Sequence, residues 1–245
     1  MRKQSLILLF FILVVAGCKQ KQSSNSNPAA KGFNAKASDP KAIAIADSVM
    51  KAMGGRKNWD QTKIIHWNFF GQRAHTWDKA TGKDSIYIPS KNMAIVENIH
   101  SKKGKVFENG KQMTQPDSVK KYLTKGYQWW VNDSYWLFMP FKMKDTGVTL
   151  KYLGIHKTQA GEPAYKLQLT FDSVGVTPQN KFWVYVDTSD HLVRQWAYFP
   201  KASMSKPAFV LPWKNYKKHG KILLSGDRGK HTLSNIKVMN HWPNK

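Results

Sequence analysis

Histidines and carboxylates are the side chains that most often hold metal ions or move protons, and the chain has eight histidines and 15 acidic residues. Only His66 and His75, nine residues apart, have a spacing that neighbouring strands could bring together with Asp78. Ordinary polar packing of the same side chains is the alternative interpretation. The sequence has no H-E-x-x-H motif and no phosphate-binding glycine loop. We therefore expect no metal site.

The sequence gives only weak indications of a serine nucleophile or of a glycoside hydrolase. Ser134 could pair with His66 or His75, but no G-x-S-x-G motif is present, and serine near a helix start is typical of local hydrogen bonding. Glycoside hydrolysis requires two carboxylates on opposite sides of the bond, and tryptophan-rich grooves suit sugar rings. The alternative hypothesis is therefore a protein that binds or hydrolyses envelope glycans, although we expect no catalytic residue. The carboxylates nearest to aromatic positions are Asp78, Glu97, Asp133 and Asp187.

Cys18 is the single cysteine, which excludes a disulfide framework, an iron-sulfur cluster and a thiolate zinc site. It follows Arg2 and Lys3, an apolar run at 6–15 and a small-residue cleavage context at 15–17. The run is about half of the roughly 20 residues that a membrane-spanning helix needs. Val-Ala-Gly-Cys resembles the lipobox of bacterial lipoproteins. The resemblance implies a signal peptide at 1–17 and a diacylglycerol and an acyl chain such as palmitate on Cys18, with no other cofactor.

Residues 18–38 have the polar, alanine- and proline-containing composition of a flexible tether, so we expect one globular domain at 39–245. A lipidated Cys18 would hold this domain on a membrane of a Gram-negative envelope, on the periplasmic side. In enteric bacteria an aspartate after the cysteine resembles an inner-membrane retention signal. Lys19 follows Cys18 here, so we expect the outer membrane.

The formal net charge is +24, or +22 once Arg2 and Lys3 are removed with the signal peptide. The excess is nearly all lysine, whereas bidentate phosphate and base contacts favour arginine. We therefore expect no nucleic-acid partner. Anionic lipid headgroups or glycans fit an exported basic protein better, since each lysine near a charged membrane contributes about 1 kcal/mol. A generally solvated basic surface is the other interpretation.

Hydrophobic periodicity indicates a mainly β chain with few helices. Asp39 as N-cap, Pro40 at the first helical position and Gly54-Gly55 as a stop predict a helix at 40–53. Helical stretches are also expected at 116–122 and 127–139. Period-two alternation and the Asn109-Gly110 turn signal predict an antiparallel meander. We expect strands at 62–69, 73–78, 85–88, 93–99, 105–108, 111–113, 148–152, 165–171, 182–187, 192–199, 222–224 and 232–239.

Several blocks together resemble an uncharacterised family of exported envelope proteins over essentially the whole mature domain. They are Ala52-Met53-Gly54-Gly55 with Trp59, 132–137 with Met139-Pro140, 151–154, and 174–178 before 183–187. In architecture that family looks similar to the outer-membrane lipoprotein carriers of the Lol pathway. The resemblance implies an α+β, mainly β fold: a curved antiparallel half barrel with an N-terminal helix and a helical lid over an apolar cavity. It also implies non-enzymatic binding of a lipid or another apolar ligand.

Aromatic side chains are the residues expected to line such a cavity, because small-molecule sites are concave and mostly apolar. Ordinary core packing is the alternative for each of them. The cavity candidates are Trp67, Phe69, Trp77, Trp129, Trp130, Tyr135, Trp136, Trp183, Tyr185 and Trp196.

Overall fold

The computed structural model describes residues 26–243. The predicted signal peptide and Cys18 lie outside the described residues, so their roles stay predictions. Within the described range, no helix is both long enough and apolar enough to cross a bilayer.

The larger sheet has eight strands, and every neighbouring pair in it is antiparallel. Asn109 and Gly110 both have positive φ angles, 52° and 77°, which is the conformation that a two-residue hairpin turn requires. In spatial order the strands are β14 (Asp227–Arg228), β15 (His231–Met239), β1 (Ile64–Phe69), β2 (Arg73–Asp78), β3 (Lys83–Ile88), β4 (Met93–Asn98), β5 (Lys103–Glu108) and β6 (Lys111–Gln112).

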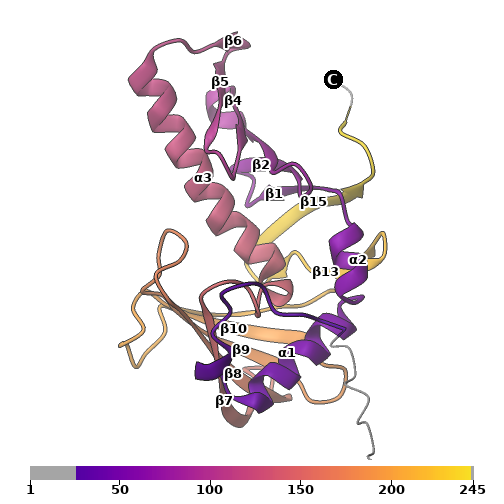
Figure 1. Cartoon of the computed structure of the whole chain (residues 1–245). Helices are drawn as coiled ribbons and strands as arrows, with labels where there is room; N and C mark the ends of the chain where they lie inside the picture. Colours follow the sequence, from indigo (N-terminus) through magenta and orange to yellow (C-terminus); the bar gives the residue numbers. More distant parts are fainter. Residues whose placement is uncertain (1–25, 244–245) are drawn as a thin grey trace, which may run out of the picture.

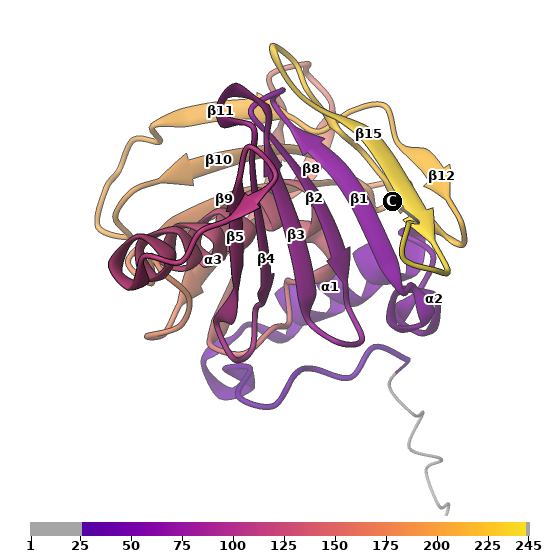
Figure 2. The same ribbon diagram turned by 90° about the horizontal axis from the view of Figure 1, so that it is seen from above.

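A second sheet of five antiparallel strands continues the curve of the first. An isolated bridge between Lys214 and Asp227 joins the chain after β11 to β14, and the two sheets curve around a common interior (Figures 1 and 2). The mainly β half-barrel architecture predicted from the sequence is therefore confirmed. The second sheet has the order β11 (Phe209–Pro212), β10 (Val193–Phe199), β9 (Lys181–Asp187), β8 (Pro163–Phe171) and β7 (Val148–Lys157), and β12 (Lys217–His219) pairs with β13 (Ile222–Leu224).

The N-terminal helix α1 (Pro40–Ala52) lies where the sequence predicts it, and the short helix α2 (Arg56–Gln61) follows it. Asp39 precedes α1 but makes no capping hydrogen bond. Its carboxylate instead accepts hydrogen bonds from the Tyr152 backbone N–H at 2.9 Å and from Lys151 Nζ at 3.0 Å. These bonds fasten the start of α1 to the edge of β7, and they lower the pKa of Asp39.

The segment 26–38 has the composition of a tether but lies against the body of the protein. It contains the 3-10 turn η1 (Ala35–Ala37), and Asn34 N–H donates to the Val148 carbonyl at 3.1 Å. Lys144 Nζ donates to the Asn27 carbonyl and to Asp47, both at 2.6 Å. Ordered structure thus begins well before Asp39, because these hydrogen bonds fix a segment whose composition carries little structural signal.

Helix α3 (Pro116–Phe138) is one continuous helix of 23 residues, where the sequence analysis expects two stretches. It crosses the concave side of the half barrel, between the two sheets (Figures 1 and 2). At its C-terminal end, Arg228 Nη2 donates to the Trp136 carbonyl at 2.7 Å, which satisfies a carbonyl near the end of the helix. The Arg228 guanidinium also lies 3.3 Å from the centroid of the Trp213 ring. The 3-10 turn η3 (Met139–Phe141) follows directly.

The interior divides into a large cluster and a small one along α3. The large cluster combines α1, β1 and the inner face of β7–β10, with Trp67, Val184 and Trp213 among its fully buried members. The small cluster lies beneath the N-terminal half of α3 and consists of Ile86, Ile88, Met93, Ile95 and Val106. Ile65, Trp67 and Phe69 alternate along β1 and are all buried, so they share its inner face.

Gly126 sets how closely α3 approaches β4. A Cβ atom at this position would lie 2.7 Å from Glu97 Oε1 and 3.1 Å from Ile95 Cγ2. The glycine also explains why the sequence pattern suggests a break in the helix, since glycine is unfavourable in helix interiors by about 1 kcal/mol relative to alanine.

We expect Gly126→Val to destabilise the protein by about 2 kcal/mol or more, because its side chain has no room between α3 and β4. Urea unfolding followed by circular dichroism measures the change. Lys125→Val, one position away on the exposed side of α3, is the control for the β-branched side chain itself and should cost under about 1 kcal/mol. Equal losses in the two variants would contradict the proposed close approach.

Candidate functional site

A cavity of about 620 Å³ lies between the C-terminal half of α3 and the inner face of β8–β11. The loop from Val174 to Thr177 and the loop at Lys142–Thr146 complete its wall. Phe182 and Trp196 on its floor are buried, whereas the rim residues Asn132 and Thr177 are exposed. The cavity is therefore open to solvent on one side.

Aromatic side chains from both layers form most of the cavity wall. Tyr135 of α3 lies 5.1 Å from Phe182 between ring centroids, and Trp136 of α3 meets Trp196 edge to face at 4.9 Å. Phe182 and Trp196 stack in parallel at 5.4 Å on the neighbouring strands β9 and β10. The period-two pattern of the strands places these side chains on one face, so the sheet presents a nearly continuous apolar surface to α3.

Three polar hydrogens of the aromatic wall have no acceptor among the described residues. They belong to the Tyr135 hydroxyl and to the indole N–H groups of Trp130 and Trp196. Burial raises the pKa of the Tyr135 hydroxyl well above its usual range, so the group stays a neutral donor. A buried donor without an acceptor costs about 1–3 kcal/mol. The cavity wall thus consists largely of aromatic rings whose polar hydrogens are covered by the protein itself.

The N-terminal segment forms part of the cavity mouth. Ala30 lines the cavity, and its N–H donates to the Lys144 carbonyl at 3.0 Å. On the same loop, Lys142 forms an ion pair with Asp145 at 2.5 Å, and both side chains line the cavity. Asp145 is the one carboxylate among the lining residues. The arrangement therefore lacks the two opposed carboxylates that glycoside hydrolysis requires.

The structure brings four of the ten aromatic candidates together at this cavity: Trp130, Tyr135, Trp136 and Trp196. The other six lie elsewhere. Trp67 and Phe69 are buried in the large core cluster, and Trp77 packs edge to face against Trp130 at 5.4 Å. Trp129 faces Arg73, whose guanidinium carbon lies 5.1 Å from the Trp129 ring. Trp183 and Tyr185 lie on the opposite face of β9 from Phe182, where Lys166 Nζ is 3.4 Å from the Trp183 ring centroid.

A buried ionic chain connects α3 with the concave face of the large sheet. His75 Nδ1 donates to Asp84 at 2.9 Å, and His75 Nε2 donates to Asp133 of α3 at 3.0 Å. Arg73 reaches the same Asp133 carboxylate with Nε at 2.8 Å and Nη2 at 3.0 Å. His75, Asp84 and Asp133 are all fully buried. Because a carboxylate faces each nitrogen of the ring, both nitrogens carry protons and His75 is an imidazolium.

The protonation states in this chain follow from burial and from the facing charges. Burial opposes the charge on His75, but Asp84 and Asp133 together raise its pKa to about 9. Burial also opposes ionisation of Asp133, but the hydrogen bonds from His75 and Arg73 lower its pKa below the usual range. Burial raises the pKa of the neighbouring Glu97 to about 8, and Asp84 adds to that rise.

Sequence reasoning did not find this ionic chain. It singles out His75 with His66 and Asp78, but His66 lies on the convex face, where its Nδ1 meets Thr76 Oγ1 at 2.9 Å. Asp78 accepts backbone hydrogen bonds in the turn after β2. One pattern in the sequence could have indicated the ionic chain. Asp84 lies two residues before Ile86, so the two side chains point to the same buried face of β3. The described residues contain no group of metal-ligating side chains that could hold an ion.

Ser134 and the other carboxylates also lie away from any catalytic arrangement. The Ser134 hydroxyl donates to the Val131 carbonyl of its own helix at 3.3 Å. Asp187 accepts hydrogen bonds in the turn between β9 and β10. Burial tends to raise the pKa of Asp187, but these hydrogen bonds lower it to about 2. Glu97 and Asp133 belong to the buried contact between α3 and the sheet. The ionic chain therefore positions α3, the helix that forms one wall of the cavity.

Comparison with known proteins finds similarity at the level of solved structures. No family model and no curated protein sequence matches the chain. A crystal structure of a DUF1329 family protein from Desulfovibrio piger aligns with 11% identity and a TM-score of 0.44, covering 84% of this chain and 96% of that one. A LolA superfamily protein from Nitrosomonas europaea aligns with 10% identity and a TM-score of 0.41, covering 82% and 94%.

A third structure, a domain from Vibrio parahaemolyticus assigned to outer membrane lipoprotein sorting, aligns with 7% identity and a TM-score of 0.41, covering 83% and 94%. All three structures are less than 25% identical to this chain, and all three TM-scores are below 0.5. Their identities and TM-scores are too low to transfer a ligand or an activity to this chain, so the function is derived below from its own cavity.

We expect the free energy of unfolding to fall as the pH rises from 6 to 9. His75 has a folded-state pKa raised from 6.5 to about 9, so its stabilisation is complete below pH 6.5 and is lost as the pH rises through 9. Glu97 has a pKa raised from 4.5 to about 8, so keeping it buried becomes less favourable as the pH rises from 4.5 to 8. Urea unfolding at several pH values measures both effects.

The Glu97→Gln substitution isolates the contribution of Glu97 to this pH dependence. This variant should show a shallower decline between pH 5 and 8 and should be more stable than the natural protein at pH 8. Glu108→Gln, at an exposed position of β5, is the matched control and should follow the natural protein. Parallel curves for the Glu97→Gln variant and the natural protein would show that Glu97 titrates normally.

Proposed function

We propose that the protein is a non-enzymatic, membrane-anchored envelope lipoprotein that binds an acylated lipid in the cavity between α3 and β8–β11. The observation that carries this proposal is the cavity itself. Its volume of about 620 Å³ lies within the range of 300–1,000 Å³ that is typical of small-molecule sites. Its wall is aromatic and aliphatic, and it opens to solvent along one side.

The chemistry of the wall favours a ligand with an acyl chain. Burial of apolar surface contributes about 25 cal/mol per Å², and Phe182 and Trp196 present such surface to the cavity. An acyl chain in the cavity would therefore remove apolar surface from water.

Anchoring through Cys18 would keep the cavity mouth close to a membrane. Only 12 residues separate Cys18 from Ala30 at the mouth, and a fully extended chain spans at most about 3.5 Å per residue, or about 42 Å in total. Lys144 holds the segment at Asn27 against the protein body. A lipidated Cys18 thus places the mouth within about one bilayer thickness of the membrane surface, which we propose is that of the outer membrane.

Native mass spectrometry of the mature chain from residue 18, carrying Cys18→Ser to remove the anchor, tests ligand binding. After incubation with envelope phospholipids, we expect an added mass that corresponds to one lipid. Val131→Trp should reduce the bound fraction about tenfold or more, because Val131 lies on the α3 wall of the cavity and a tryptophan there would fill much of the space.

Lys121→Trp, at an exposed position of α3 outside the cavity, is the control and should leave the bound fraction unchanged. Thermal unfolding of both variants shows whether each is folded. Two outcomes would overturn the proposal: a natural protein that binds no lipid under these conditions, or a folded Val131→Trp variant that binds as well as the control.

A further inference from the structure

A second cavity, of about 880 Å³, adjoins the first along α3. The two share Tyr127 and Val176 among their lining residues. One stripe of α3 lines both, because Lys120 and Thr124 face the second cavity, Tyr127 faces both, and Val131 and Tyr135 face the first. These residues follow one another at intervals of three or four, which places them on the same side of a helix. The two cavities therefore form one groove along α3.

The polarity of the groove changes from one end to the other. The first cavity ends on the stacked rings of Phe182 and Trp196. The second cavity is lined by Lys102 and Lys120, by neutral polar residues and by apolar ones, namely Gln112, Thr114, Thr124, Gln128, Met113, Pro116, Val119 and Leu123. Its described lining residues include no carboxylate. The groove thus has an aromatic end near the second sheet and an end near β5 and β6 where two lysines lie beside apolar side chains.

The two lysines of the groove have no anionic partner. Among the described residues neither Lys102 nor Lys120 takes part in an ion pair, and both are exposed. Lys102 Nζ lies 4.3 Å from the centroid of the Tyr127 ring, which directs it over the junction of the two cavities. Further exposed lysines lie on β5, β6 and α3, namely Lys103, Lys105, Lys111, Lys121 and Lys125.

The length of the groove fits one acyl chain with its headgroup. Lys120 and Tyr135 are 15 residues apart on α3, which corresponds to about 22 Å along the helix axis. One acyl chain occupies half of a hydrocarbon core about 30 Å thick, or about 15 Å. The remaining length accommodates a polar headgroup beside Lys102 and Lys120.

We propose that the groove selects an anionic amphiphile, with its acyl chain in the first cavity and its negatively charged headgroup between Lys102 and Lys120. This inference rests on the proposed lipid binding and adds the class and the orientation of the ligand. The unpaired ammonium groups attract a phosphate or carboxylate, and no carboxylate among the lining residues of the second cavity competes with it.

Two lysophospholipids with the same palmitoyl chain test the selectivity. Lysophosphatidylglycerol is anionic and lysophosphatidylcholine is zwitterionic, so only the headgroup differs. Titration calorimetry on the mature chain carrying Cys18→Ser should show tighter binding of the anionic lipid by roughly 20-fold, since each lysine near a negative headgroup contributes about fivefold. The double variant Lys102→Gln/Lys120→Gln should bring the two affinities within about twofold of each other and leave lysophosphatidylcholine binding unchanged.

Lys121→Gln/Lys125→Gln is the matched control, since it removes the same charge from exposed positions of α3 that line neither cavity. It should keep the preference for the anionic lipid. An equal loss in the control would show general electrostatic attraction and would overturn the headgroup site. Inorganic phosphate is the third ligand, and binding as tight as that of the anionic lipid would overturn the proposal in favour of a free-anion site.

The outcomes also separate the two proposals. If neither lysophospholipid binds, both the lipid-binding function and the headgroup site fail. If both bind with equal affinity and the lysine substitutions change nothing, the lipid-binding function stands and the headgroup site fails.

Discussion

The contact between Asp133 and the pair Arg73 and His75 determines the shape of the interior. Apart from this contact and the hydrogen bond from Arg228, α3 packs on the large sheet mainly through apolar side chains, and apolar contacts are not directional. The ionic chain fixes both the rotation of α3 and its position along the strands, because Asp133 must meet His75 while Gly126 meets Glu97. The opposite side of α3 then faces β8–β11 at a distance that leaves a cavity. A buried ion pair is weak evidence for stability, so the contribution of this one is the direction that it gives to the packing of α3.

The second fixed point of α3 is at its C-terminal end, where the fully buried Arg228 contacts it. Its guanidinium packs on Trp213 and donates to the Trp136 carbonyl. Trp136 in turn forms the wall of the cavity with Trp196. The ionic chain at Asp133 and the arginine at the end of the helix therefore fix where Tyr135 and Trp136 meet the floor of the cavity, at Phe182 and Trp196.

Most of the fold could be predicted from the sequence, because strand alternation and turn residues are local signals. The helix at α1, the meander from β1 to β6 and the hairpin of β9 and β10 all lie close to their expected positions. The continuity of α3 could not be predicted, since Gly126 signals a break unless Glu97 is known to lie against it. Short strands such as β11 and β14 carry too few residues for a periodic pattern.

The site was harder to predict because its aromatic residues look alike in sequence. Trp130 lines the cavity and the adjacent Trp129 faces Arg73, and Phe182 lines it while Trp183 lies on the other side of β9. Neighbours in sequence point in different directions, so only the packing of α3 against both sheets separates wall residues from core residues. Aromatic side chains line the cavity, but the sequence alone could not assign each of them to the wall or to the core.

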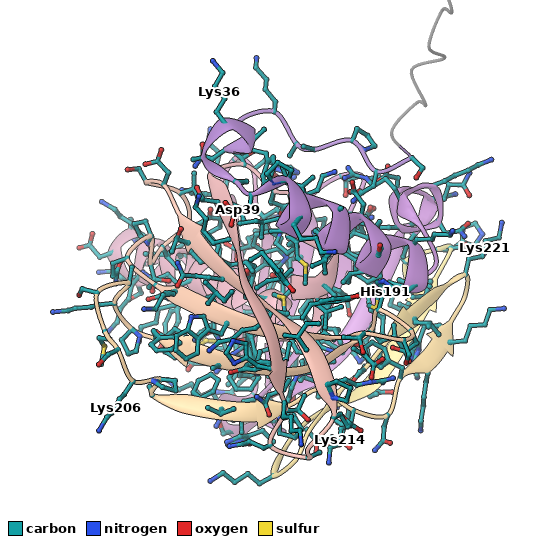
Figure 3. All side chains as sticks on the ribbon, turned by 90° about the horizontal axis from the view of Figure 1, so that it is seen from below. Lys36, Asp39, His191, Lys206, Lys214 and Lys221 are labelled. Atoms are coloured by element: carbon teal, nitrogen blue, oxygen red, sulfur yellow. The ribbon has the colours of Figure 1, made fainter. Side chains whose placement is uncertain are left out.

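The net charge of the chain likewise does not identify the ligand or its site. Lysines project from many parts of the surface, including Lys36, Lys206 and Lys221 (Figure 3), so an overall excess of positive charge identifies no site. Lys102 and Lys120 differ from these in their surroundings rather than in type. They line the second cavity, whose described lining residues include no carboxylate, and Lys102 lies over Tyr127 where the two cavities meet. An amphiphile with a negative headgroup matches both ends of that groove, whereas a soluble anion matches one end and a neutral hydrocarbon the other.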